Sequence, residues 1–267
     1  MEEIHLSSWS EFTAHSAVLD GWAFRGQRVA QWPIVSSLMR HLQLFCPDQS
    51  LWQLREERAL RVFRRKAHVY LRDPSVLDDD LRCLALMQHH GAPTRLIDFT
   101  KSPFAAAFFA FQRAEDSVAV YAINTPALWR SVPRDDPSLV RDAIDPRRAG
   151  NYERYFISNR HPVVWFGEPN QMDARLVAQS GVLVMPGVLN QPLDQILARY
   201  DGNEPLLRKF VMPVSIRDEA MQSLYRMNIT QATLFPDLDG LARSITYELE
   251  MVWSQLIDDF RARQSSE

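Results

Sequence analysis

Residues 83–111 read CLALMQHHGAPTRLIDFTKSPFAAAFFAF, and this stretch joins two apolar ends through a polar middle. Apolar side chains such as Leu84, Met87 and Phe104 favour burial, whereas the polar side chains between them need hydrogen-bonding partners. The polar residues of the middle are Gln88, His89, His90, Thr94, Arg95, Asp98, Thr100 and Ser102. Polar groups held between two buried helices predict a functional site at the centre of the fold.

Capping signals divide this stretch into two helices. Asp79 or Asp80 is a suitable N-cap for a helix that runs to about His90, where Gly91 ends it. Ser102 is the N-cap of a second, nearly all-apolar helix over residues 103 to about 113, with a proline at its first position. The amino-terminal end of that helix, together with Arg95, would suit a phosphate or another anion.

Helical and strand patterns alternate along the rest of the chain. Helices are predicted at 48–71, 217–226 and 241–263, and strands at 21–26, 117–123, 163–166, 174–178, 181–185 and 207–214. Residues 124–161 are interrupted by prolines and predict a loop-rich insertion. No repeat or linker separates two halves, so we expect one mixed α+β domain over residues 1–267, with a helical N-terminal portion and a long C-terminal helix packed on it.

Composition favours a globular protein without a metal centre. The chain has 267 residues, 46% of them hydrophobic, and a formal net charge of −3, which gives no overall attraction to nucleic acid or to anionic membranes. Its two cysteines, Cys46 and Cys83, do not belong to a C-x-x-C motif. His89 and His90 are adjacent on a helix and point in different directions, so they cannot easily bind one metal ion together. No signal peptide or membrane span is visible, so we expect a soluble cytoplasmic protein with no membrane partner.

One predicted helix carries a basic stripe. Arg55, Arg58, Arg61 and Arg65 follow one side of the helix expected over residues 48–71. Such a stripe could bind the phosphates of a nucleic acid. A solvated helix face with no ligand is the alternative, and the sequence leaves both open.

The central stretch resembles the hallmark of the FRG domain family. The resemblance rests on QHHGAPTRLIDFTKSPFAAAFFA and on the Phe24-Arg25-Gly26 tripeptide, within WAFRGQ, for which the family is named. RLVAQSG at 175–181 and TLFPDLDGLARSI at 233–245 are similar to further stretches of the family, in the same order. The four stretches imply one FRG-type domain that spans nearly the whole chain.

FRG proteins resemble the ADP-ribosyltransferase superfamily, which implies a split β core and NAD as a co-substrate. In that layout an arginine on the first strand holds NAD, a role that falls on Arg25, and Gly26 would let the ligand approach the backbone. Thr100 and Ser102 take the position of the hydroxyl motif. The full set of residues implied to bind NAD is Arg25, Gly26, His90, Thr94, Arg95, Thr100 and Ser102.

The catalytic residue on the late strand departs from the superfamily pattern. That position usually holds a glutamate, whereas RLVAQSG offers Gln179. Asp98 could supply the missing carboxylate or could be a structural partner of Arg95. His90 could cap its helix or contact the ligand. Asp237 or Asp239 could cap the last helix, or Asp237 could reach the cleft.

Three functions follow from these residues. No G-x-S-x-G, P-loop or G-x-G-x-x-G motif is present, so the expected enzyme is an NAD-dependent ADP-ribosyltransferase. Its acceptor would be a macromolecule, RNA or DNA rather than protein, as for a bacterial toxin or phage-defence effector with a neutralising antitoxin. The alternatives are an NAD glycohydrolase and a non-catalytic module that binds a nucleotide or nucleic acid.

Overall fold

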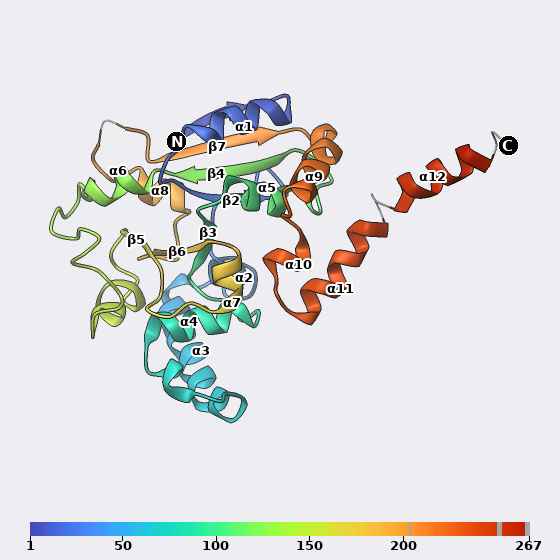
Figure 1. Ribbon diagram of the computed structural model, residues 1–267. Helices are drawn as coiled ribbons and strands as arrows, with labels where there is room; N and C mark the ends of the chain where they lie inside the picture. Colours follow the sequence, from blue (N-terminus) through green and yellow to red (C-terminus); the bar gives the residue numbers. More distant parts are fainter. Residues whose placement is uncertain (203, 250–252, 265–267) are drawn as a thin grey trace.

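A seven-stranded sheet runs through the computed structural model, which describes residues 1–202, 204–249 and 253–264. The strands are β1 (Glu2–His5), β2 (Ala23–Gln27), β3 (Ile97–Thr100), β4 (Val118–Ile123), β5 (Val164–Gly167), β6 (Gly181–Pro186) and β7 (Leu207–Met212). Their order is β1-β7-β4-β2-β3-β6-β5, with β1 and β7 parallel and the other neighbours antiparallel (Figure 1). The expected mixed α+β fold, with helices packed around one sheet, is confirmed.

The sheet is nearly divided between β2 and β3. These two strands pair at one position, Phe24 opposite Thr100. By contrast, β2 pairs with β4 over five residues, and β3 pairs with β6 over four. The sheet therefore consists of a four-stranded half and a three-stranded half, and we call the junction of β2 and β3 the seam.

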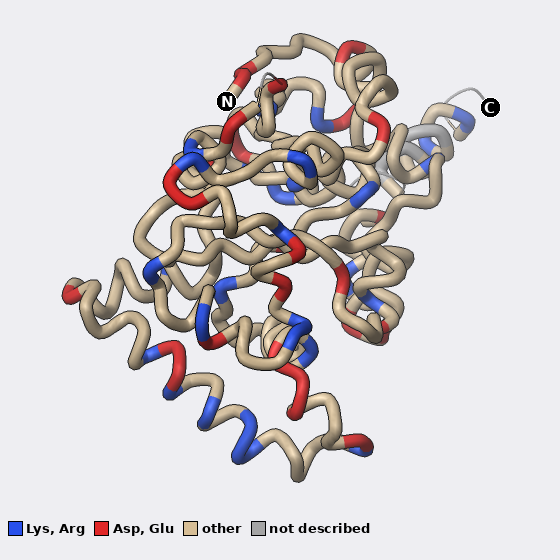
Figure 2. Tube along the Cα trace, turned by 90° about the vertical axis from the view of Figure 1, so that its left-hand side faces the viewer, with Lys and Arg blue, Asp and Glu red and all other residues tan. Residues whose placement is uncertain are grey.

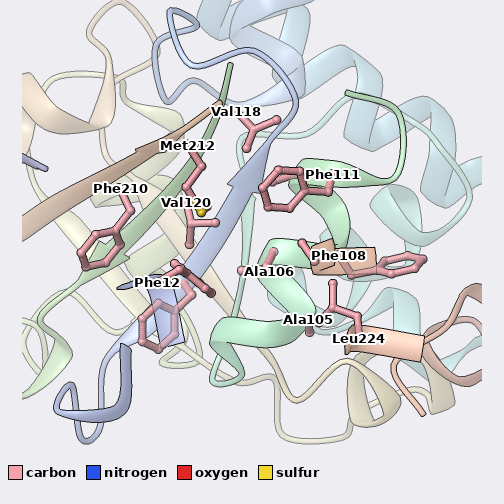
Figure 3. Packing of buried hydrophobic residues seen from close by; sticks show 14 of the residues in the cluster. Phe12, Ala105, Ala106, Phe108, Phe111, Val118, Val120, Phe210, Met212 and Leu224 are labelled. Carbon is pink, nitrogen blue, oxygen red and sulfur yellow. The ribbon is translucent and has the colours of Figure 1, made fainter. Parts of the chain in front are cut away.

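One face of the four-stranded half is covered by α1 (Trp9–Ala17), α5 (Pro103–Phe111) and α9 (Arg217–Arg226). Phe12, Phe108 and Phe210 are among the side chains that interlock there (Figure 3). The Ser102 side chain accepts a hydrogen bond from the Ala105 backbone N–H at 3.1 Å, and Pro103 occupies the first turn of α5. The predicted cap and the predicted buried helix are both confirmed.

The three-stranded half is covered on the same side by α3 (Trp52–Ala67) and α4 (Asp80–His89). The opposite side of the sheet packs against α6 (Thr125–Arg130) and α8 (Leu193–Leu197). The remaining elements are α2 (Ser37–Phe45), η1 (Gln49–Leu51), η2 (His68–Tyr70), η3 (Pro74–Leu77), η4 (Tyr152–Ile157), α7 (Ala174–Ala178), η5 (Val214–Ile216), α10 (Gln231–Leu234), α11 (Leu238–Tyr247) and α12 (Trp253–Gln264).

Gly26 lets α5 lie directly on β2. A Cβ atom at this position would stand 1.9 Å from the Ala106 carbonyl oxygen and 2.7 Å from the Ala110 nitrogen. Both are backbone atoms, so the helix itself would have to move. Gly26 therefore makes room for α5. The family resemblance had implied a different role, in which Gly26 lets a ligand approach the backbone.

Gly26→Ala is expected to lower the free energy of unfolding by about 1–3 kcal/mol, since overpacking a well-packed contact costs that much. Urea denaturation followed by circular dichroism measures the change. A variant as stable as the wild type would show that α5 can shift freely on β2.

Several segments differ from the prediction. Residues 174–178, expected as a strand, form α7, because the Asp173 side chain caps a helix there by accepting from the Leu176 N–H at 2.8 Å. Both β1 and α2 were missed. The 124–161 segment is irregular apart from α6 and η4, yet it places Ile144 and Phe156 in the core.

Over the described residues, most of the predicted C-terminal helix does not pack on the N-terminal portion, although Tyr247 packs against the core cluster that contains α1. Leu241 and Ile245 of α11 and Leu256 of α12 are exposed, and Figure 1 shows both helices leading away from the sheet. The part of the predicted 241–263 helix at 250–252 lies outside the described residues. Within the described ranges, no helix is long and apolar enough to cross a membrane.

Candidate functional site

Arg95 is a structural residue in this fold. It is fully buried, and its Nε donates to Glu56 Oε1 at 2.6 Å while a second guanidinium nitrogen donates to the other carboxylate oxygen. Its third nitrogen donates to the Pro186 carbonyl at 2.9 Å, and the Tyr152 hydroxyl also donates to Glu56. Burial is the largest influence and lowers the pKa of Arg95, but the charge and hydrogen bonds of Glu56 and Tyr152 together outweigh it, and the pKa is raised. This guanidinium ties α3 to the start of β3, instead of facing a ligand as expected.

Arg25, on β2, differs from Arg95 because its guanidinium is not paired with a carboxylate among the described residues. The side chain is half-buried, and Nη1 donates to the Asp98 carbonyl at 2.7 Å. Its Nε is buried and has no hydrogen-bond partner, and no carboxylate forms an ion pair with it among the described residues. Burial lowers the pKa of Arg25, the charge of Asp98 raises it, and nearby Arg40 lowers it again. An arginine stays charged under such shifts, so a cation with unused donors lies at the seam.

A pocket opens on the other side of β3, between α4 and α7. We call it the α4–α7 pocket, and its lining residues are Ala85, Gln88, His89, Asp98, Asp173, Arg175, Leu176, Gln179 and Leu183. Gln88 Nε2 donates to Asp98 Oδ1 at 2.5 Å, and the Thr94 hydroxyl donates to Gln88. The predicted catalytic residues Asp98 and Gln179 thus line one pocket. Thr94 positions Gln88, which in turn holds Asp98.

Arg175 lines this pocket and was not among the predicted site residues. Its guanidinium lies 4.2 Å from the centroid of the Phe235 ring, and Nη1 donates to the His89 carbonyl at 3.4 Å. Burial lowers the pKa of Arg175, and the carboxylates of Asp98, Asp173 and Asp237 oppose that shift. The signal was available, since Arg175 opens the RLVAQSG stretch that resembles the family.

The two histidines and Asp237 have definable structural roles. His90 is the C-cap of α4 and its side chain is exposed, whereas the ring of His89 lies 3.1 Å from Asp173 Oδ2. The Asp237 side chain caps α11 by accepting from the Gly240 N–H at 2.7 Å. The capping alternative for Asp237 is confirmed, whereas His90 caps α4 through its backbone N–H and not through its imidazole.

Hydroxyl groups hold the ends of the strands together. The Thr100 hydroxyl donates to the Gln179 carbonyl at 2.6 Å, and the Ser102 backbone N–H donates to Thr100 Oγ1 at 3.0 Å. Gln179 follows α7 as its C-cap and precedes β6, so it does not lie within a strand. Its side-chain Nε2 donates to the Leu234 carbonyl at the end of α10, at 3.0 Å.

The positions predicted for NAD binding and catalysis share one row of the sheet but not one face. Phe24 pairs with Thr100, and Thr100 pairs with Gly181, so β2, β3 and β6 are aligned at the same end. Arg25 follows Phe24, and side chains alternate along a strand. The side chains of Arg25 and Thr100 therefore project from opposite faces of the sheet. The Arg25 guanidinium reaches the Asp98 carbonyl at the seam.

A larger cleft, of about 760 Å³, lies at this end of the sheet. It is lined by Phe24, Lys101 and Val182, which belong to the row or adjoin it, and by Trp129 and Arg141. The Arg141 guanidinium lies 3.8 Å from the Trp129 ring centroid. The volume is in the range of pockets that hold small molecules.

The basic stripe on α3 is more strongly positive than its sequence indicated. Arg55, Arg58, Arg61 and Arg65 are exposed and form no ion pair among the described residues. Figure 2 colours the lysine and arginine positions along the trace blue. Glu56, which would offset them, points inward to Arg95. Over the described part of the chain, no group of three or more His, Cys, Asp and Glu side chains could hold a metal ion.

Comparison with known proteins gives one match. No curated protein and no solved structure matches the chain significantly. The family model of the FRG domain matches residues 20–118, a segment that contains Arg25, Arg95 and Asp98, whereas Arg175 and Gln179 lie beyond it. Residues 20–118 therefore match the FRG domain family.

Proposed function

We propose that the protein binds NAD⁺ at the seam and transfers its ADP-ribose to a macromolecule. The observation that carries the proposal is the contrast between the two arginines of the FRG segment. Arg95 has all its charge satisfied by Glu56, whereas Arg25 has no ion pair among the described residues and leaves a buried Nε without a partner. A half-buried guanidinium with free donors suits the diphosphate of a dinucleotide, which accepts paired hydrogen bonds.

The proposed chemistry needs no strong base. The bond between nicotinamide and the ribose C1′ breaks, nicotinamide leaves as a neutral molecule, and an acceptor oxygen or nitrogen forms the new bond to C1′. Arg25 would hold the diphosphate while the reacting sugar develops oxocarbenium character. Asp98 and Gln179 line the α4–α7 pocket, on the face of the sheet opposite to the Arg25 side chain, so the proton of the acceptor would pass to water and not to Asp98.

The basic face of α3 favours nucleic acid as the acceptor. Four exposed arginines at helical spacing, with Glu56 turned inward, give a positive stripe that can neutralise successive phosphates. Protein acceptors would not require such a stripe.

The direct test incubates the purified protein with NAD⁺ labelled on the adenylate phosphate and offers RNA, DNA and cell protein separately. Label on RNA or DNA supports the proposal, and label on protein alone would contradict the nucleic-acid acceptor. Nicotinamide release without transfer of label would identify a glycohydrolase. Intact NAD⁺ with a folded protein would leave a binding module as the function.

Reversing charge on α3 is expected to weaken RNA binding without affecting the seam. For the double variant Arg58→Glu, Arg61→Glu, the slope of log K against log salt should fall by about 1.4, because each lost phosphate contact on a single strand contributes about 0.7. Fluorescence anisotropy with a labelled RNA measures the slope. The matched control, Arg148→Glu with Arg226→Glu, changes two exposed arginines elsewhere and should keep the wild-type slope. Equal slopes for both pairs would refute the role of α3.

A further inference from the structure

We propose that the cleft of about 760 Å³ at the end of the sheet binds an unpaired base of the acceptor nucleic acid, and that this base stacks on Trp129. We call it the α6 cleft, after the helix that carries Trp129. The inference deepens the proposed function and rests on its nucleic-acid acceptor. It names the part of the acceptor that the protein holds beside the seam.

Trp129 is held firmly in the α6 cleft and is still half exposed. The Arg141 guanidinium lies 3.8 Å from the centroid of the indole, and the Phe166 ring packs against it at 73°, with centroids 5.9 Å apart. The Trp129 side chain nevertheless remains 52% exposed. A single exposed tryptophan is ordinary on a protein surface. One that is fixed by its neighbours within a cleft offers a flat aromatic surface to a ligand.

Arg141 fixes the indole because it is itself fixed. Its side chain is 8% exposed, its Nε donates to the Phe166 carbonyl at 2.9 Å, and its Nη1 donates to Asp142 at 2.8 Å. These bonds hold the guanidinium against the Trp129 ring before any ligand arrives. A preorganised aromatic side chain loses little conformational entropy when a ligand stacks on it, so the affinity gained from stacking is largely kept.

The charges of the α6 cleft favour an uncharged ring over a phosphate. Each cation of the lining is paired with a carboxylate, in the pairs Lys101–Glu168, Arg141–Asp142 and Arg147–Asp145. Asp20 also lines the cleft and forms no ion pair among the described residues. A free nucleotide would carry its phosphate into these surroundings. A base within a nucleic acid would not, since the phosphates of the strand can lie outside the cleft.

The inner wall of the α6 cleft is aromatic as well. Trp22 and Phe24 are buried there, and Phe166 continues the wall from β5. These rings and Trp129 come from separate parts of the chain, and together they form an apolar site for a flat group. Stacking on aromatic side chains tolerates any base, because every base has a π-face. We therefore expect binding of single strands with little sequence preference.

The α6 cleft adjoins the proposed NAD site. Phe24, whose pairing with Thr100 joins the two halves of the sheet, lines the cleft, as does Ala23. Side chains two residues apart on a strand share a face, so Ala23 and Arg25 project from the same face, about 7 Å apart. A nucleotide whose base occupies the cleft would thus bring its sugar and backbone close to NAD⁺ held by Arg25.

The test measures the affinity for a short labelled single-stranded RNA by fluorescence anisotropy, without NAD⁺. Trp129→Ala should raise the Kd at least about fivefold, the lower end of the loss when a stacking side chain is removed, whereas Trp129→Phe keeps a ring and should stay within about threefold of the wild type. Trp253→Ala changes a tryptophan of α12 that is 53% exposed and lies outside the cleft. This matched control should leave the Kd unchanged.

An oligomer of the same length without bases separates stacking from phosphate binding. The wild type should bind it more weakly than RNA, and Trp129→Ala should bind it as tightly as the wild type does, because the lost contact is to a base. RNA should also quench more tryptophan fluorescence in the wild type than in Trp129→Phe, a readout that a purely structural role of Trp129 would not give.

Three results would overturn the inference. They are the same RNA Kd for Trp129→Ala and the wild type, an equal loss of affinity for the oligomer without bases, and a raised Kd for NAD⁺ in place of RNA, which would assign the cleft to a ring of the co-substrate. The seam is tested by the NAD⁺ affinity of Arg25→Ala, and the cleft by RNA binding without NAD⁺. Failure of the cleft and failure of the seam can therefore be distinguished.

Discussion

Glu56→Ala is expected to lower the free energy of unfolding by about 3–5 kcal/mol, the usual cost of removing one partner from a buried ion pair. The substitution leaves the fully buried guanidinium of Arg95 without its carboxylate, and removes the acceptor of the Tyr152 hydroxyl. It also frees α3 from the residue that leads into β3. Urea denaturation at neutral pH measures the loss.

Two further variants make this test specific. Glu57→Ala removes the neighbouring carboxylate, which accepts a hydrogen bond from Gln53, and should cost less than about 0.5 kcal/mol. Glu56→Leu with Arg95→Met removes both buried charges and should recover most of the lost stability. A Glu56→Ala protein within 1 kcal/mol of the wild type would contradict the structural role given to Arg95.

Arg25→Ala is expected to reduce NAD-dependent labelling of the acceptor at least about 100-fold, the loss typical when one charge-stabilising group is removed from a reaction site. The side chain contributes one hydrogen bond to the fold, to the Asp98 carbonyl, so the variant should unfold at nearly the same urea concentration. Rates of label transfer, together with the unfolding curve, measure the two effects.

Arg25→Lys separates charge from geometry. A lysine keeps the positive charge but not the planar fork that meets two oxygens of a diphosphate, so its activity should lie between those of the alanine variant and the wild type. Arg28→Ala, at an exposed arginine three residues along, is the matched control and should retain full activity. Full activity in Arg25→Ala would refute the seam as the NAD site.

Local signals sufficed for much of the fold. The caps at Asp79 and Ser102 and the proline at position 103 placed α4 and α5 correctly, because capping depends on residues within one helical turn. The strand predicted at 174–178 failed for a related reason, since the capping signal of Asp173 was not weighed. The strand β1 pairs with β7 across nearly the whole chain, which no local pattern reports.

The site was harder to predict because burial and partners decide what a polar residue does. Arg25 and Arg95 lie in equally suggestive motifs, and only the position of Glu56 separates the satisfied arginine from the open one. Asp98 and Gln179, both proposed as catalytic residues, line the same pocket, but Arg175 was overlooked. The exposed apolar side chains of α11 and α12 formed a helical stripe in the sequence, and a stripe does not state whether anything covers it.

The most direct test of the seam is the affinity for NAD⁺ itself, measured by titration calorimetry on the wild type, Arg25→Ala and Arg28→Ala under the same salt. We expect the Kd of Arg25→Ala to rise at least tenfold, with Arg28→Ala equal to the wild type. The same Kd for Arg25→Ala and the wild type would show that the unpaired guanidinium at the seam does not hold the diphosphate, and would contradict the proposed function.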